Sequence, residues 1–321
     1  MLQFFVAGNI DTYGAILYRR AIWRICAAGA TAGAAKDLIM KEGIRNKTMN
    51  SKIIDFHTHA FPDFLAEKAV TKLAEHSGEY KPFHMGSIKE LLASMDGAGV
   101  DKSLVANIAT KPEQIASILK WSGEIRSDRI LPLASFYPNN PNWQSDVEAI
   151  KKSGFRGIKL HPLYQNFFID DENLFDIYDR LQTEEIFILF HAGYDIAFGK
   201  QDNAAPFRIA KILKEFPRLT IIASHMGSWK DWDNVLALLS GKNLYFDTSF
   251  IHEIEPALRD KILSKHNDEF FLFGSDSPWL SQKQQIDFID GLNISSDYKE
   301  KIFYKNGENF LRKYYDPLSS R

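Results

Sequence analysis

The 321-residue chain is 45% hydrophobic and 25% charged, which is ordinary composition for a globular protein with a substantial core. Its formal net charge of -2 argues against nucleic acid or an anionic membrane as a bulk partner, and no apolar run reaches the ~18–20 residues of a membrane span. The single cysteine, Cys26, excludes an internal disulfide framework and suits a reducing cytosol. Because the N-terminus also lacks a secretory signal pattern, we expect a cytoplasmic protein with no integral membrane segment.

The first 48 residues differ in composition from the rest. The stretch from Tyr18 to Met40 is rich in alanine and prone to form a helix, although Gly29 and Gly33 weaken it. One interpretation is an amphipathic helix that packs on the domain or touches a membrane surface. The other, which we favour, is a poorly ordered extension. We therefore divide the chain into an N-terminal extension, 1–48, that is poorly ordered or helical, and one domain, 49–321.

From residue 53 onward, short apolar runs typical of buried parallel strands alternate with segments of helical periodicity. Capping boxes at Ser87–Glu90 and Thr110–Glu113 mark two helix starts. Eight strand–helix units over about 270 residues predict an α/β fold, a closed (β/α)8 TIM barrel that is either regular or distorted. An open doubly wound sheet is the alternative, but no G-x-G-x-x-G or Walker A loop follows a strand. The predicted strands are Ile53–His57, Ser103–Ile108, Ile130–Phe136, Phe155–Leu160, Ile186–Phe190, Thr220–Ser224, Leu244–Asp247 and Phe270–Phe273.

The connection after the first strand is unusually long. It runs from Phe61 to Lys102 and holds two predicted helices, with a break that contains glycine and proline at His76–Gly86. In a barrel, the loops after the strands lie on the face that carries the active site. We expect this helical insertion to cover the site, although a surface insertion without a role is the alternative.

Five of the nine histidines fall at the carboxyl ends of predicted strands. A lone histidine in such a place is more often structural than a ligand, but the carboxyl ends of barrel strands converge on one face. So many polar groups in an apolar barrel mouth would be costly unless they are paired or bind metal, and imidazole with carboxylate suits zinc and its divalent neighbours. The sequence therefore predicts a divalent metal site on this face. The residues are His57 and His59 on strand one, His161 on four, His191 on five, His225 on six and Asp276 after eight.

Six segments taken together resemble the amidohydrolase superfamily. Within it, the chain looks most like the amidohydrolase-related branch that includes the aminocarboxymuconate-semialdehyde decarboxylase-like proteins. The resemblance runs from about Met49 to about Lys313, with NGENFLR near its end, and implies a metal-dependent TIM-barrel enzyme. The segments are IIDFHTHAFP (Ile53–Pro62), GIKLHPLYQNFF (Gly157–Phe168), LFHAG (Leu189–Gly193), ASHMGSW (Ala223–Trp229), YFDTSF (Tyr245–Phe250) and FGSDSPW (Phe273–Trp279).

The resemblance assigns roles to the histidines and to Asp276. His57, His59 and His191 match metal ligands, and Asp276 matches the strand-eight aspartate, which binds metal and takes a proton from the bound water. His225 matches a residue that is a second-metal ligand in binuclear members and a catalytic acid or base in mononuclear decarboxylases.

Lys159 stands where binuclear members carry a carbamylated lysine, which this branch usually lacks. Because Lys159 and His161 share a strand face, either a second metal or a substrate carboxylate would fit beside them. We expect one ion, most simply Zn²⁺, with two as the alternative. Asp247 on strand seven is expected either to hydrogen-bond a ligand imidazole or to pair with backbone.

Three functions remain open. The first is a metal-dependent hydrolase of a small amide, ester or lactone that acts through a metal-activated water, with Asp276 and His225 as its catalytic residues. The second is a metal-dependent, non-oxidative decarboxylase of a small unsaturated or aromatic carboxylic acid. The third is a catalytically silent metal-binding protein. The expected partner is a small-molecule substrate, while its identity and the oligomeric state, a homodimer among the alternatives, are left open.

Overall fold

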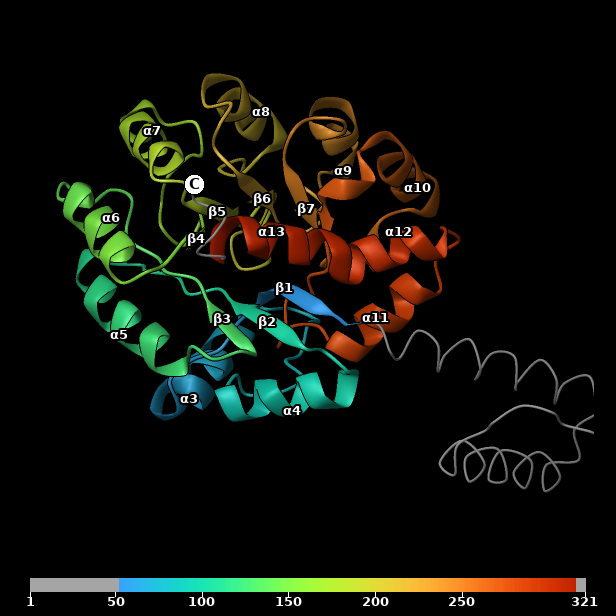
Figure 1. Cartoon of the computed structure of the whole chain (residues 1–321), viewed down its shortest axis with the longest axis horizontal. Helices are drawn as coiled ribbons and strands as arrows, with labels where there is room; N and C mark the ends of the chain where they lie inside the picture. The colour runs from blue at the N-terminus through green and yellow to red at the C-terminus, as the bar shows by residue number, and fades with distance from the viewer. Residues whose placement is uncertain (1–51, 316–321) are drawn as a thin grey trace, which may run out of the picture. The chain divides into compact units, whose positions relative to one another are not determined.

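Eight short strands, all paired in parallel with their neighbours in sequence, form the centre of the part of the chain that the computed structural model describes, residues 52–315 (Figure 1). Each overlaps the strand predicted for it. The extension predicted at 1–48 lies outside the described residues. The strands are β1 (Ile54–Thr58), β2 (Lys102–Val105), β3 (Ile130–Pro132), β4 (Gly157–Leu160), β5 (Phe187–Phe190), β6 (Ile221–Ala223), β7 (Tyr245–Asp247) and β8 (Phe271–Leu272).

Backbone hydrogen bonds join a sheet of three strands, β1 to β3, and a sheet of five, β4 to β8, into one closed barrel. At the first seam, Ala134 N donates to Gly157 O at 3.0 Å and Lys159 N donates to Ala134 O at 2.9 Å. At the second seam, Phe56 N donates to Phe273 O at 2.7 Å. The predicted (β/α)8 barrel is therefore confirmed, with local distortion at the two seams.

Helices cover the outside of the barrel (Figure 1). The capping box predicted at Ser87 is confirmed, since Glu90 N donates to Ser87 Oγ at 3.2 Å and Ser87 N donates to Glu90 Oε2 at 3.1 Å. The one predicted at Thr110 is wrong in its partners, because Pro112 opens the helix and makes Lys111 the N-cap and Gln114 the third helical residue. The main helices are α3 (Asp63–Ala74), α4 (Ile88–Ala98), α5 (Ile115–Ile125), α6 (Trp143–Lys152), α7 (Phe175–Thr183), α8 (Pro206–Glu215), α9 (Trp232–Asn234), α10 (Pro256–Lys265), α11 (Gln282–Asp290), α12 (Ser296–Glu300) and α13 (Asn306–Tyr315). Across residues 52–315, no helix is both long and apolar enough to cross a membrane.

Helix α13 seals the amino end of the barrel. Its Phe310 and Tyr314 pack against the apolar side chains that fill the barrel interior, such as Phe56 and Phe187. A β-carbon on Gly307 would lie 2.7 Å from Phe56 Cε2, so glycine at this position lets the helix press against the strands. The barrel interior is thus closed at this end by apolar packing, whereas the predicted site residues lie at the opposite, carboxyl end of the strands.

The outer core contains one histidine whose protonation opposes folding. His266 follows α10, its ring stacks on Phe246 at a centroid distance of 4.2 Å, and its Nδ1 accepts a hydrogen bond from Gly241 N at 3.1 Å. Burial lowers the pKa of His266 from 6.5 to about 4. Since the folded-state pKa lies below the unfolded one, its contribution to stability is present above pH 6.5 and is lost as the pH falls toward 4.

Replacing His266 by glutamine should therefore flatten the acid side of the stability profile. A shift of this size corresponds to about 3 kcal/mol between neutral pH and pH ~4. Urea unfolding of both proteins at the two pH values measures it, and the variant is expected to lose less unfolding free energy on acidification. An equal loss in the two proteins would contradict this assignment.

Candidate metal centre

The carboxyl ends of β1, β4, β5, β6 and β8 bring the predicted site residues into one buried cluster. His59 is the most exposed side chain among the predicted ligands, at 15%, while His57 and Asp276 are at 1% and 9%. The five imidazole rings follow one another in a row. Their centroid distances are 5.1 Å for His59–His57, 5.2 Å for His57–His225, 4.8 Å for His225–His191 and 4.0 Å for His191–His161.

Three electron-pair donors face one another at the β1–β8 seam. His57 Nδ1 donates to Asp247 Oδ2 at 2.9 Å and His59 Nδ1 donates to Ala106 O at 3.0 Å, which leaves both Nε2 atoms as lone pairs in the neutral rings. Asp276 Oδ1 lies 3.4 Å from His57 Nε2 and 3.1 Å from His59 Nε2. Burial raises the pKa of Asp276, because its charged form loses hydration, and a cation beside the carboxylate would offset that cost. Two imidazole nitrogens and one carboxylate oxygen that converge in this way fit a divalent cation.

An irregularity in β1 aims His57 at this point. The pairing register with β2 shifts between Asp55 and Thr58, and such a bulge turns the following side chains relative to a regular strand. Asp55 meanwhile joins β1 to the segment after β8, because its carboxylate accepts hydrogen bonds from Ser275 Oγ at 2.6 Å and Gln282 Nε2 at 2.9 Å. The strand that carries two of the predicted ligands is thus fixed to the segment that carries the third.

Asp247 hydrogen-bonds both the His57 ring and the backbone after β6. Besides accepting from His57 Nδ1, it accepts hydrogen bonds from the backbone N of His225 and of Ser249, each at 3.0 Å, and from the Ser249 hydroxyl. Both alternatives for Asp247 are therefore present, the pairing with backbone and the contact with an imidazole predicted to be a ligand. The hydrogen bond from His57 Nδ1 to Asp247 fixes the tautomer of His57 and keeps Nε2 free of a proton.

His191 and His225 face each other through two ring nitrogens that both lack a hydrogen, so one proton or cation can bind between these two atoms. His191 Nε2 donates to Tyr194 O at 2.9 Å, so its Nδ1 is a lone pair. Because Ser249 gives its hydroxyl hydrogen to Asp247, it can only accept from His225 Nδ1, at 2.8 Å. His225 Nε2 is then also a lone pair, and it faces His191 Nδ1 at 3.1 Å. Burial lowers the pKa of both rings well below 6.5, which is consistent with their neutral forms.

Lys159 lies on β4, and His161 directly follows the strand. Lys159 Nζ donates to Ser224 Oγ at 3.3 Å and lies 3.2 Å from His57 Nε2, and burial lowers the pKa of Lys159 to about 8. His161 accepts a hydrogen bond from Tyr164 N at Nδ1, at 3.4 Å, and its Nε2 lies 3.4 Å from Asp195 Oδ2. The ring nitrogens of His161 and His191 that face Asp195 therefore carry hydrogens, which disfavours a metal among these three residues.

The backbone is strained where the site residues leave their strands. His225, Phe250 and Asp276 have φ values of 59°, 59° and 61°, a left-handed region that residues other than glycine rarely adopt. They follow β6, β7 and β8, respectively. Such strain is characteristic of functional sites, where surrounding contacts impose a side-chain direction.

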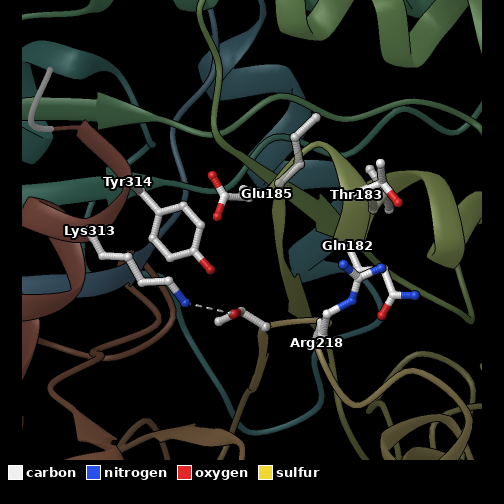
Figure 2. Close-up of a pocket in the computed structure, with 9 residues that line it drawn as sticks. Gln182, Thr183, Glu185, Arg218, Lys313 and Tyr314 are labelled. Atoms are coloured by element: carbon white, nitrogen blue, oxygen red, sulfur yellow. Dashed lines mark hydrogen bonds between the residues drawn. The ribbon is translucent and has the colours of Figure 1, made fainter. Parts of the chain in front are cut away.

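A separate cavity of about 360 Å³ lies at the other end of the barrel, beside α13 (Figure 2). Figure 2 shows Lys313 and Tyr314 facing Gln182 and Arg218. These last two residues precede β5 and β6, whereas the clustered histidines follow those strands. The cavity is therefore distinct from the histidine cluster and takes no part in its chemistry.

Comparisons with known proteins identify the family and the fold of this chain. Residues 54–313 match the family model described as amidohydrolase. No curated protein matches the sequence. Among solved structures, an uncharacterized TIM-barrel protein from Bordetella bronchiseptica is 21% identical with a TM-score of 0.68, and the match covers 82% of this chain and 99% of that one.

Two further similar structures are decarboxylases. The 2,6-dihydroxybenzoate decarboxylase from Rhizobium is 14% identical with a TM-score of 0.59, over 82% of this chain and 99% of that one. The 5-carboxyvanillate decarboxylase from Novosphingobium aromaticivorans, solved with bound manganese, is 13% identical with a TM-score of 0.61, over 82% of this chain and 98% of that one. At these identities the likeness establishes the fold.

Proposed function

Because the chain belongs to the amidohydrolase family, we propose that it is a metal-dependent, non-oxidative decarboxylase of a small aromatic or unsaturated carboxylic acid. The observation that carries the proposal is the convergence of His57 Nε2, His59 Nε2 and Asp276 Oδ1. Decarboxylation, the second alternative from the sequence, is now preferred to hydrolysis because structures with this fold include enzymes named for that reaction.

His57, His59 and Asp276 would hold the metal, and His191 stays a predicted fourth ligand, because its Nδ1 faces His225 rather than the other three donors. When bound, a divalent cation would stabilise negative charge that develops on the substrate. An imidazole–carboxylate set accepts Zn²⁺, the ion that the sequence favoured, and also Mn²⁺, so the choice between them is open to measurement.

Aromatic side chains border the cluster on two sides. Tyr164 contacts His161 at a ring-centroid distance of 4.6 Å and Phe198 at 4.9 Å, while Phe250 lies 5.2 Å from His225. Aromatic side chains in these positions favour a substrate with a planar, apolar ring. Lys159, buried at the centre, would meet the negative charge of a substrate carboxylate.

Decarboxylation breaks the bond between the substrate carbon and its carboxylate carbon. The electron pair stays on the substrate carbon, carbon dioxide leaves, and a proton takes its place, so no oxidant or reductant is needed. We propose that His225 Nε2 carries that proton, because this atom has a lone pair directed into the cluster. Asp247, through Ser249, keeps the His225 ring in the required orientation.

A substrate panel tests this function. Aromatic and unsaturated carboxylic acids are supplied beside lactones, esters and amides, and the release of carbon dioxide and of hydrolysis products is followed. We expect carbon dioxide from at least one acid, loss of turnover with chelator, and recovery with Mn²⁺ or Zn²⁺. Hydrolysis without carbon dioxide release would reject the proposal, and so would a metal-loaded protein that turns over nothing in the panel.

Hydrolysis is the second candidate, and the position of Lys159 is the observation that favours it. Its Nζ lies 3.2 Å from His57 Nε2, where, by resemblance, binuclear hydrolases carry a carbamylated lysine. Two metal equivalents per chain would support this candidate, whereas one equivalent is expected for the decarboxylase.

A further inference from the structure

Residues 76–86, which connect α3 to α4, cross the carboxyl ends of four strands; we call them the strap. Phe83 N donates to Pro278 O at 2.8 Å, and His84 Nε2 lies 2.9 Å from Ser277 Oγ, both after β8. At the other side, a β-carbon on Gly78 would lie 3.3 Å from Ile196 Cδ1, after β5. The strap therefore spans the mouth above the histidine cluster, which agrees with the covering role expected from the sequence.

One carboxylate joins the strap to the loops after β6 and β7. Glu253, in the turn Ile251–Glu253, accepts hydrogen bonds from the Tyr80 hydroxyl, from Trp229 Nε1 at 3.1 Å and from Lys230 Nζ at 2.6 Å. Its side chain is only 12% exposed. A partly buried carboxylate with three donors from two other loops fixes their relative positions, because hydrogen bonds to a charged group are stronger than neutral ones.

Three aromatic rings fill the space between this carboxylate and the cluster. The ring of Tyr80 lies 5.5 Å from that of Phe250 and 6.2 Å from that of Trp229, and these two are 5.8 Å apart. Phe250 in turn lies 5.2 Å from His225. We call Tyr80, Trp229 and Phe250 the aromatic wall. Phe250 adopts a left-handed backbone conformation, which is rare for a bulky residue, and its ring contacts Tyr80 and Trp229 as well as His225.

We propose that Glu253 is a positioning residue for this site. By holding Tyr80 and Trp229, it sets the aromatic wall against His225 and keeps the strap closed over the cluster. The inference rests on the proposed function only in taking the cluster as the active site, and it holds whether the reaction is decarboxylation or hydrolysis. It implies that substrate enters by displacement of the strap, since the side chains of His57, His191 and Asp276 are each less than a tenth exposed.

Two variants test the hydrogen bonds of Glu253 while the size of the side chains stays nearly the same. Tyr80→Phe removes one hydroxyl and keeps the ring of the aromatic wall, and Glu253→Gln keeps the shape but loses the charge. Tyr298→Phe is the matched control, because its hydroxyl also makes one partly buried hydrogen bond, to Leu263 O at 2.9 Å, but joins α12 to α10.

The first readout is hydrogen–deuterium exchange of the full-length protein. Loss of a charge-assisted hydrogen bond should raise exchange of the strap amides about tenfold or more in Tyr80→Phe and Glu253→Gln, and not in Tyr298→Phe. The second is the rate at which a chelator removes Mn²⁺ from the loaded protein, which should rise in the same two variants. With an active substrate, KM should rise more than kcat falls.

The outcomes distinguish this inference from the proposed function. Unchanged exchange in the strap for both variants would overturn the role of Glu253, whatever the enzyme does. Faster exchange with unchanged chelator removal and unchanged KM would also overturn it, since the strap would then not control the site. If the wild-type protein holds no Mn²⁺, the proposed function fails, whereas the exchange readout still decides whether Glu253 fixes the strap.

Discussion

Replacing His59 by alanine is expected to remove both the bound metal and the activity. His59 is the most exposed predicted ligand, at 15%, and its Nδ1 donates one hydrogen bond, to Ala106 O, so its loss should cost the fold little. His57 is less suited, because its removal would leave Asp247 Oδ2 unpaired in the interior. Loss of a direct ligand should weaken metal binding by at least the ~10–100-fold seen when an outer partner of a ligand is removed.

Metal content after dialysis, measured by mass spectrometry, checks this prediction together with turnover. Lys68→Ala is the control, because Lys68 is exposed on α3 and lies outside both the cluster and the segment 76–86. The control should keep the metal content and activity of the wild type, while His59→Ala loses both and unfolds at a similar temperature. A His59→Ala protein that retains a full equivalent of metal would show that the cation, if present, binds elsewhere.

Replacing His225 by asparagine should instead abolish turnover and spare the metal. General acid–base catalysis contributes typically ~10²–10⁴-fold, so kcat is expected to fall by about that factor. Asparagine suits the position, because it tolerates the left-handed backbone conformation, with φ of 59°, better than most residues. The backbone N of His225 can still donate to Asp247.

The relation between kcat and metal content decides the role of His225. A large loss of kcat at unchanged metal content supports a proton carrier. If the wild type holds two equivalents of metal and the variant only one, His225 is a ligand and the two-metal alternative is correct. Unchanged kcat would remove His225 from the mechanism.

The barrel could be predicted because its cause is local in the sequence. Eight apolar runs separated by helical periodicity admit few arrangements, and each predicted strand overlaps an observed one. The seams could not be predicted, because the bond from Phe56 N to Phe273 O joins residues that no pattern relates. The failed capping box at Thr110 has a simpler origin, since Pro112 moves the helix start by one residue.

The histidine cluster could be predicted for a similar reason, since the strand ends of a barrel must converge. The groups that set the tautomers of these histidines could not be predicted. Ala106 contributes only a carbonyl, and Ser249 is a common residue whose role depends on where Asp247 directs its carboxylate. Glu253 carries no motif, and its importance comes from three donors that lie on two other loops. Among these, only Asp247 had been weighed from its position on a strand.

The order of the two enzymatic functions could not be fixed by the ligand residues. Two imidazoles and an aspartate suit a metal for hydrolysis and for decarboxylation alike, so the sequence analysis put hydrolysis first without a residue that excludes decarboxylation. The two reactions differ in the shape that they require of the surrounding loops and in how far these loops must exclude water from the site. Their contacts, such as that of Phe250 with His225, arise only in the folded chain.

The most direct test is an anomalous-scattering measurement on crystals of the protein grown with Mn²⁺. We predict one anomalous peak at about 2.0–2.3 Å from His57 Nε2, His59 Nε2 and an oxygen of Asp276. A protein that crystallises with these three side chains intact and shows no peak among them would contradict the assignment of the metal centre.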